Sequence, residues 1–253
     1  MDEQYAVESA RAVDAAESVV RWHELVADRS WAEIRFDAVV VPAGGSSRRH
    51  RYATQETLYV PLDGPGQIGL GEARVTVPQH GVLRVPPATP RRIVNTGAES
   101  RTWLAIGAPP ESGPDAVPAR ADEDSDPEFA VVDVGDRPFE GPGENNSVPS
   151  LRLTRPLDAT ELKVNVRRLR PGDEIPLHVH GTQEEAFVPL DGPGRMRVAD
   201  EEISVPAGAV FTVPPSTPRG AVNRGDEPRD WLMVGAPPTG GPEQWGVDYE
   251  ILE

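Results

Sequence analysis

The chain has 253 residues, enough for one large domain or two of about 125 residues each. It contains no cysteine, which excludes disulfides and thiolate metal ligands, and its net charge of −16 disfavours nucleic acid and anionic membranes as partners. No apolar run approaches the ~20 residues of a membrane span, and the acidic residues 1–4 do not resemble a secretory signal. We therefore expect a cytoplasmic protein.

The first segment in chain order, residues 6–20, could pass for a helix when taken alone. However, residues 5–7 resemble residues 129–131, which makes residues 131–148 the counterpart of this first segment. Residues 131–148 contain two prolines and several glycines. Proline breaks a helix interior because it lacks the N–H and clashes with the preceding turn. Extended structure is therefore predicted for both segments.

An internal repeat dominates the rest of the chain. One constant offset, without a gap, matches roughly half of the positions over three blocks, and such a match does not arise by chance. The matched blocks are 56–66 with 184–194, 85–91 with 213–219, and 103–110 with 231–238. We predict a tandem duplication with barrels at 1–112 and 128–253, joined by an acidic, proline-rich linker at 113–127.

Short segments within each copy favour β-structure. In the second copy, polar and apolar residues alternate or apolar residues cluster in runs of strand length, and turn-forming sequences separate these runs. The predicted strands are 195–198, 202–205, 210–213 and 230–234, and the predicted turns are 191–194 and 206–208. Many short strands at regular spacing predict an all-β sandwich or barrel, of which the jelly roll is one common form.

The second copy resembles a cupin. The family's first motif is matched at every spacing by Gly172, His178, His180, Glu185 and Gly192. Its second motif is approximated by residues 206–208, 214–218 and 223. The resemblance implies an all-β fold of two tandem cupin-type jelly-roll β-barrels, a bicupin, with a candidate metal site in the second.

The candidate metal ligands are His178, His180 and Glu185. Residues i and i+2 of a strand share a face, so both imidazoles can point into the barrel, and a bend at 181–182 would let Glu185 join them. Two histidines and one carboxylate suit Fe, Mn, Ni, Co or Zn. In the alternative interpretation, the two histidines are partly exposed strand residues without a metal.

Arg219 departs from the family pattern. Cupins normally place a third histidine there, and the first copy also has an arginine, Arg91, at this position. Because a guanidinium cannot ligate a metal, two outcomes stay open: Arg219 binds a substrate carboxylate, or it pairs with Glu184 or Glu185. The pairs Glu56 with Arg91 and Glu184 with Arg219 suggest a structural ion pair shared by both barrels.

The first copy has a degenerate site. Its residues at the matching positions are His50, Tyr52, Thr57 and Arg91. One imidazole cannot hold a catalytic metal, so this barrel is expected to be structural or to bind an organic ligand without metal. His80 matches no ligand position and is expected in a turn, where the second copy has Gly208.

Two functions follow from these observations. The first is a metal-dependent enzyme of dioxygenase, decarboxylase or isomerase type that acts on a small anionic metabolite held by Arg219. The second is a non-enzymatic bicupin that binds a small molecule or is purely structural. A homo-oligomer is possible, and the sequence leaves open the substrate, the metal and whether strands are exchanged between barrels or chains.

The composition also resembles that of a haloarchaeal cupin protein, because only one of the 25 basic residues is lysine. At ~1 M salt the Debye length is only ~3 Å, so repulsion between surface carboxylates is largely screened. We therefore predict that the melting temperature falls when KCl is lowered from molar to low concentration. A melting temperature independent of salt over that range would contradict adaptation to salt.

Overall fold

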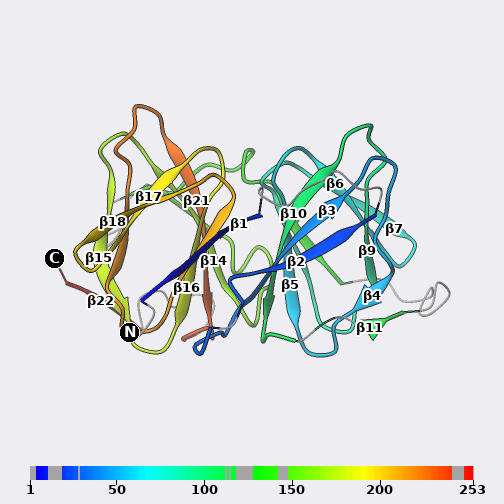
Figure 1. Cartoon of the computed structure of the whole chain (residues 1–253), viewed down its shortest axis with the longest axis horizontal. Coiled ribbons are helices and arrows are strands. Elements are labelled where there is room, and N and C mark those ends of the chain that lie inside the picture. Colours follow the sequence, from blue (N-terminus) through cyan, green and yellow to red (C-terminus); the bar gives the residue numbers. More distant parts are fainter. Residues whose placement is uncertain are drawn as a thin grey trace. The chain divides into compact units, whose positions relative to one another are not determined.

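The computed structural model describes residues 4–10, 19–27, 29–111, 113, 115–117, 128–141, 148–240 and 248–252. Every named element within these residues is a β-strand, which confirms the predicted all-β fold. None of the described segments is a helix of the length and apolarity that a membrane span requires. The chain divides into two compact units, each with two antiparallel sheets in facing layers (Figure 1).

The first barrel is the unit formed by residues 10–25 and 34–135. One of its sheets has the order β12-β8-β5-β10-β3-β2 and the other has the order β11-β4-β9-β6-β7. The strands are β2 (Arg21–Leu25), β3 (Arg35–Val41), β4 (His50–Arg51), β5 (Glu56–Pro61), β6 (Gly66–Leu70), β7 (Ala73–Val77), β8 (Val82–Val85), β9 (Arg91–Val94), β10 (Arg101–Ala108), β11 (Asp115–Ala116) and β12 (Ala130–Val132).

The second barrel is the unit formed by residues 1–9, 26–33 and 136–253. Its sheets have the orders β1-β19-β16-β21-β14-β13 and β18-β17-β20-β15-β22. The strands are β1 (Ala6–Ser9), β13 (Ser150–Arg152), β14 (Lys163–Leu169), β15 (Glu174–His180), β16 (Glu184–Pro189), β17 (Gly194–Val198), β18 (Glu201–Val205), β19 (Ala209–Val213), β20 (Arg219–Val222), β21 (Arg229–Ala236) and β22 (Tyr249–Ile251). The four strands predicted in this copy are confirmed as β17, β18, β19 and β21.

Each barrel takes a strand that lies outside its own copy of the repeat. β1, at the start of the first copy, pairs with β19, and β12, at the start of the second copy, pairs with β8. Extended structure is confirmed only at the start of each segment, where β1 and β12 lie, and residues 11–18 and 142–147 lie outside the described residues. Tyr5 anchors the first exchange by stacking on Phe211 at 5.0 Å between ring centroids.

The exchange interleaves the two copies along the chain. Only part of the predicted linker is described, and within it Asp115–Ala116 form β11, which pairs with β4. The predicted division into a first copy (1–112), a linker (113–127) and a second copy (128–253) describes the order along the chain, and it stays a prediction. The predicted turn at His80 is confirmed, because His80 has φ +62° and Gly208 at the matching position has φ +72°.

The core of each barrel contains a fully buried tryptophan that lies over a glycine. A Cβ added to Gly194 would lie 1.9 Å from Cζ2 of Trp231, and a Cβ added to Gly66 would lie 1.9 Å from Cζ2 of Trp103. A side chain of any size is therefore excluded at these two glycines. Around Trp231 pack apolar residues of both sheets, including Ile175, Phe187 and Phe211, and these two sheets enclose the candidate site.

Candidate metal centre

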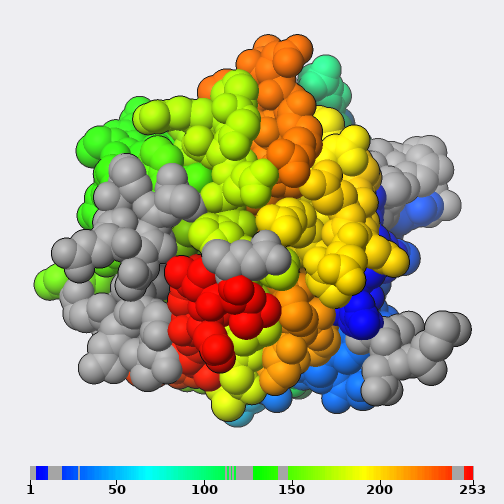
Figure 2. Space-filling view, turned by 90° about the vertical axis from the view of Figure 1, so that its left-hand side faces the viewer, coloured from blue at the N-terminus to red at the C-terminus, as the bar shows by residue number. Residues whose placement is uncertain are grey.

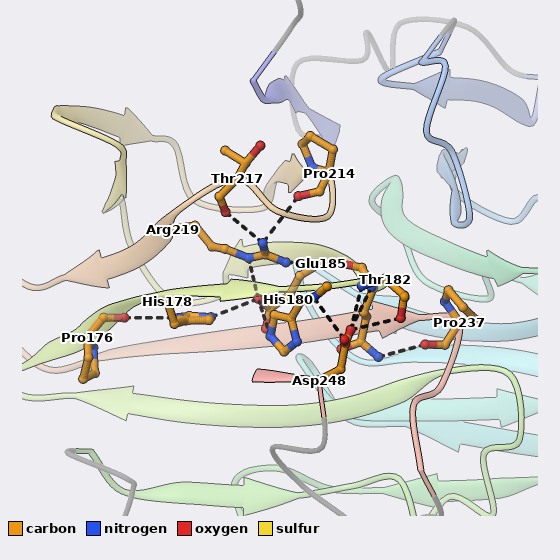
Figure 3. Close-up of polar contacts among 12 residues, drawn as sticks. Pro176, His178, His180, Thr182, Glu185, Pro214, Thr217, Arg219, Pro237 and Asp248 are labelled. Atoms are coloured by element: carbon orange, nitrogen blue, oxygen red, sulfur yellow. Dashed lines mark hydrogen bonds and ion pairs between the residues drawn. The ribbon is translucent and has the colours of Figure 1, made fainter. Parts of the chain in front are cut away.

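Three potential metal ligands converge inside the second barrel. His178 and His180 lie on β15 and Glu185 lies on β16, and their ligand atoms are all within 4.8 Å of one another (Figure 3). His178 is 1% exposed, Glu185 is 7% exposed, and the side chain of His180 is 12% exposed. The structure thus brings the three predicted ligands together in a largely water-free environment.

The turn between β15 and β16 places Glu185 on the same side as the histidines. The carboxylate of Asp248 accepts hydrogen bonds from the backbone N–H groups of Gly181, Thr182 and Gln183 at 3.0, 2.8 and 3.1 Å, and from Oγ1 of Thr182 at 3.0 Å. Burial alone would raise the pKa of Asp248, but its hydrogen bonds to this turn lower it. The bend that the sequence required at 181–182 is therefore fixed by a residue that sequence reasoning missed.

The tautomer of His178 leaves a lone pair directed at Glu185. Nδ1 of His178 lies 2.8 Å from the carbonyl oxygen of Pro176, which can only accept, so Nδ1 carries the proton. In the neutral ring Nε2 is then an acceptor, yet it lies 3.3 Å from Oε2 of Glu185, which is also an acceptor. Nε2 of His180 lies 3.5 Å from the same oxygen, and Nδ1 of His180 is buried without a partner.

This arrangement requires a proton or a cation between the rings and the carboxylate. Metal bonds of about 2.0–2.2 Å at roughly tetrahedral to octahedral angles separate neighbouring ligand atoms by about 3.0–3.5 Å. The observed distances of 3.3 and 3.5 Å match that spacing. Two imidazoles and one carboxylate therefore fit Fe, Mn, Ni, Co or Zn.

Glu185 is held in its ionised form. Burial raises the pKa of Glu185, but protonated imidazoles of His180 and His178, which then donate to Oε2, hold this pKa well below its usual range. Without a metal, protons on the imidazoles therefore balance the carboxylate, and a metal ion that binds here must displace them.

Arg219 is paired with the carboxylate of the cluster. It is fully buried, and its Nε donates to Oε2 of Glu185 at 3.2 Å. Nη1 donates to the carbonyl oxygens of Thr217 at 2.8 Å and Pro214 at 3.4 Å, and Nη2 donates to that of Gln183 at 3.2 Å. Burial lowers the pKa of Arg219 and the charge of Glu185 opposes that effect. All three nitrogens are thus engaged with protein atoms.

The predicted ion pair shared by both barrels is wrong. Glu184 is paired with Arg29, and Glu56 is paired with Arg84 at 2.9 Å. Arg91, the counterpart of Arg219, instead donates to the carbonyl oxygens of Thr89 and Pro86 and to Thr57. Adjacent strand residues face opposite sides of a sheet, so Glu185 shares the interior with Arg219 while Glu184 faces away.

Tyr249 is a second residue that sequence reasoning missed. It lies opposite His180 on the neighbouring β22, with its ring centroid 4.6 Å from that of His178 and 5.5 Å from that of His180. Burial raises the pKa of Tyr249 while Arg167 lowers it. Figure 2 shows the described C-terminal residues, in red, on the surface of the second barrel. No sequence motif around the His-x-His pair identifies such a residue, because β22 (Tyr249–Ile251) lies far from β15 in the sequence.

The matching positions in the first barrel form a different cluster. Nδ1 of His50 lies 2.9 Å from the carbonyl oxygen of Arg48 and Nε2 lies 3.4 Å from the hydroxyl of Tyr59. Burial lowers the pKa of His50 to about 4, so the ring is neutral at pH 7. Thr57 stands where the second barrel has Glu185. Among the described residues, only the second barrel brings three potential ligands together.

The comparisons with known proteins agree with this architecture. Residues 165–235 match the family model of the cupin domain. An uncharacterized protein of Methanocaldococcus jannaschii is 32% identical over 76 residues, which cover 30% of this chain and 61% of that protein. The chain thus spans about three fifths of the length of this curated relative.

Solved structures resemble nearly the whole chain at low identity. Oxalate decarboxylase of Bacillus subtilis has a TM-score of 0.69 at 14% identity, covering 97% of this chain and 79% of that chain. Salicylate 1,2-dioxygenase of Pseudaminobacter salicylatoxidans has a TM-score of 0.68 at 13% identity, covering 92% of this chain and 83% of that chain. Protein Ylba of E. coli has a TM-score of 0.69 at 13% identity, covering 93% of this chain and 92% of that chain. These likenesses show the fold, and the stretch that matches the cupin-domain model carries His178, His180 and Glu185.

Proposed function

We propose that the second barrel binds a divalent metal ion through His178, His180 and Glu185 and acts on a small anionic metabolite. The observation that carries this proposal is the convergence of two imidazole Nε2 atoms on one buried carboxylate oxygen. In the neutral rings these are lone pairs without a shared proton, which is the arrangement that a cation stabilises. Such a metal would polarise a bound oxygen atom or provide a binding site for O2.

The chain's own residues supply position and charge. Arg219 holds Glu185 by one charged hydrogen bond, Asp248 fixes the turn that presents it, and Tyr249 packs against both imidazoles. Two structural neighbours are named for oxalate and salicylate, both small carboxylates. They support, at the level of fold, a carboxylate substrate and a dioxygenase or decarboxylase reaction, with isomerase chemistry as a further form of the same proposal.

A second candidate function is a non-enzymatic, metal-free bicupin. The ion pair between Arg219 and Glu185 favours it, because a guanidinium already neutralises the carboxylate. In either case the first barrel is proposed to be structural or to bind an organic ligand around His50. The tandem duplication and the adaptation to salt belong to both forms of the proposal.

Elemental analysis of protein purified without an affinity tag distinguishes the two functions. We expect close to one divalent ion per chain after incubation with Fe, Mn, Co, Ni or Zn. His178→Ala should remove it, because the ring supplies a ligand, and the matched control His50→Ala in the first barrel should retain it. A chain that takes up none of these ions would support the metal-free function, and an ion that is kept in His178→Ala would contradict the proposed ligand set.

A further inference from the structure

Arg167 sends a guanidinium into the second barrel from β14. Along this strand Asn165, Arg167 and Leu169 share a face, and Leu169 belongs to the apolar core of the barrel. Across the sheet, Asn165 pairs with Met233 and Arg167 with Trp231, which are core residues too. The strand therefore places a polar and a charged side chain on a face that is otherwise apolar.

The Arg167 side chain has no protein partner that accounts for its position. Its Nε is buried without a hydrogen bond, although the residue as a whole is half-buried, and the structure shows no hydrogen bond or ion pair of this side chain to any described residue. Oδ1 of Asn165 on the same face is also buried without a partner. An unpaired charge in a protein interior is costly. The outward-facing neighbour Arg168, by contrast, binds Asp230 through two hydrogen bonds of 2.7 and 2.6 Å.

The guanidinium of Arg167 belongs to the same interior as the metal cluster. Burial lowers its pKa, and the charges of Glu185 and Tyr249 act against that effect, so both groups are close enough to interact with it. Tyr249 in turn contacts His178 and His180. Arg219 thus contacts the Glu185 carboxylate at 3.2 Å, and Arg167 acts on the same carboxylate at longer range.

We propose that Arg167, and not Arg219, binds the negatively charged group of the ligand, and that this group is a carboxylate or a similarly small anion. The proposal rests on the proposed function for the identity of the site, but not on the presence of metal. Arg219 cannot take this role without losing contacts, because all three of its nitrogens already donate to protein atoms. Arg167 offers a fork of N–H donors that suits a carboxylate.

The first barrel lacks this feature. The offset of the repeat places Val39, a fully buried apolar residue, at the position of Arg167. At the position of Asn165 it places Asp37, which Arg35 neutralises through hydrogen bonds of 2.7 and 2.9 Å. An unpaired interior cation therefore accompanies the histidine and glutamate cluster and is absent from the matching face of the other barrel.

Calorimetric titration of the full chain with acetate, malonate and benzoate, in metal-free and metal-loaded form, tests the proposal. We expect at least one of these anions to bind and uncharged acetamide not to bind. Arg167→Gln should weaken anion binding at least about tenfold, Arg167→Lys should retain part of it, and the matched control Arg168→Gln should leave it unchanged. Without ligand, Arg167→Gln should melt at the same or a higher temperature, because it removes a half-buried charge that has no ion-pair partner among the described residues.

The outcomes separate this inference from the proposed function. Anion binding that depends on Arg167 in a chain that takes up no metal would sustain the inference and overturn the metal function. If the chain binds stoichiometric metal but wild type and Arg167→Gln bind the anions with equal affinity, the metal function is sustained and the inference about Arg167 is overturned. If the wild type binds none of the three anions, there is no anion site and the inference is overturned. If both Arg167 variants melt at a lower temperature, Arg167 is a structural arginine and the inference is overturned as well.

Discussion

Glu185→Gln is expected to abolish stoichiometric metal binding by the second barrel while the chain stays folded. The amide keeps the size of the side chain but loses the negative charge that His178, His180 and Arg219 share at Oε2. Loss of residues that only orient metal ligands costs 10–100-fold in affinity, so loss of a ligand itself should cost more than about 100-fold. Metal content and metal titration of the purified variant measure this effect.

The adjacent carboxylate provides the matched control. Glu184 is fully buried and accepts hydrogen bonds from Arg29, from Oγ1 of Thr212 at 2.5 Å and from the backbone N–H of Glu33 at 2.7 Å. Glu184→Gln removes the negative partner of a buried arginine and should destabilise the fold by about 3–5 kcal/mol. It should nevertheless retain the metal, because Glu184 faces away from the histidines.

Together the two variants assign different roles to neighbouring residues of one strand. Both variants remove the negative partner of a buried arginine and should lose stability in denaturant titration, but only Glu185→Gln should also lose the metal. If Glu185→Gln binds metal as tightly as the wild type, the carboxylate is not a ligand, and Arg219 alone accounts for its position.

Gly194→Ala is expected to destabilise the second barrel strongly. The added methyl group would lie 1.9 Å from Cζ2 of Trp231, which is fully buried, so the indole must move or the strand must shift. Overpacking of this kind costs about 1–3 kcal/mol and sometimes more. For a domain of this size 3 kcal/mol corresponds to a fall in melting temperature of about 6–12 °C.

Gly66→Ala repeats this experiment in the first barrel, where the added methyl group would lie 1.9 Å from Trp103. Gly141→Ala is the neutral control, because Gly141 is exposed and its Cβ would meet no heavy atom within 4 Å. Differential scanning calorimetry then compares the three variants. A Gly194→Ala chain that melts together with Gly141→Ala would show that Trp231 does not require the space above this glycine.

The strands and the candidate ligands were predictable because both depend on local patterns. Alternation identified β17 and β18, the repeat transferred these assignments between the copies, and the i, i+2 rule placed His178 and His180 on one face. The same rule could have chosen the partner of Arg219, since Glu184 and Glu185 must face opposite sides. The expectation of a shared ion pair failed because it compared positions in the repeat instead of faces of the strand.

What the sequence did not predict depends on contacts between distant segments. The exchange of β1 and β12 is set by which sheet edge is free to accept a strand, and no local pattern records that. Asp248 and Tyr249 reach the site only because β22 pairs with β15. No sequence pattern singled out Arg167, and the lack of a partner for its Nε becomes visible only in the interior of the folded barrel.

Anomalous X-ray scattering at the absorption edge of the bound metal tests the central claim most directly. Crystals of the full chain loaded with that metal should show a peak bonded to Nε2 of His178, Nε2 of His180 and the carboxylate of Glu185, and none beside His50. A map with no peak at that position, in which the Arg219 guanidinium fills the space between the two imidazoles, would contradict a metal centre in the second barrel.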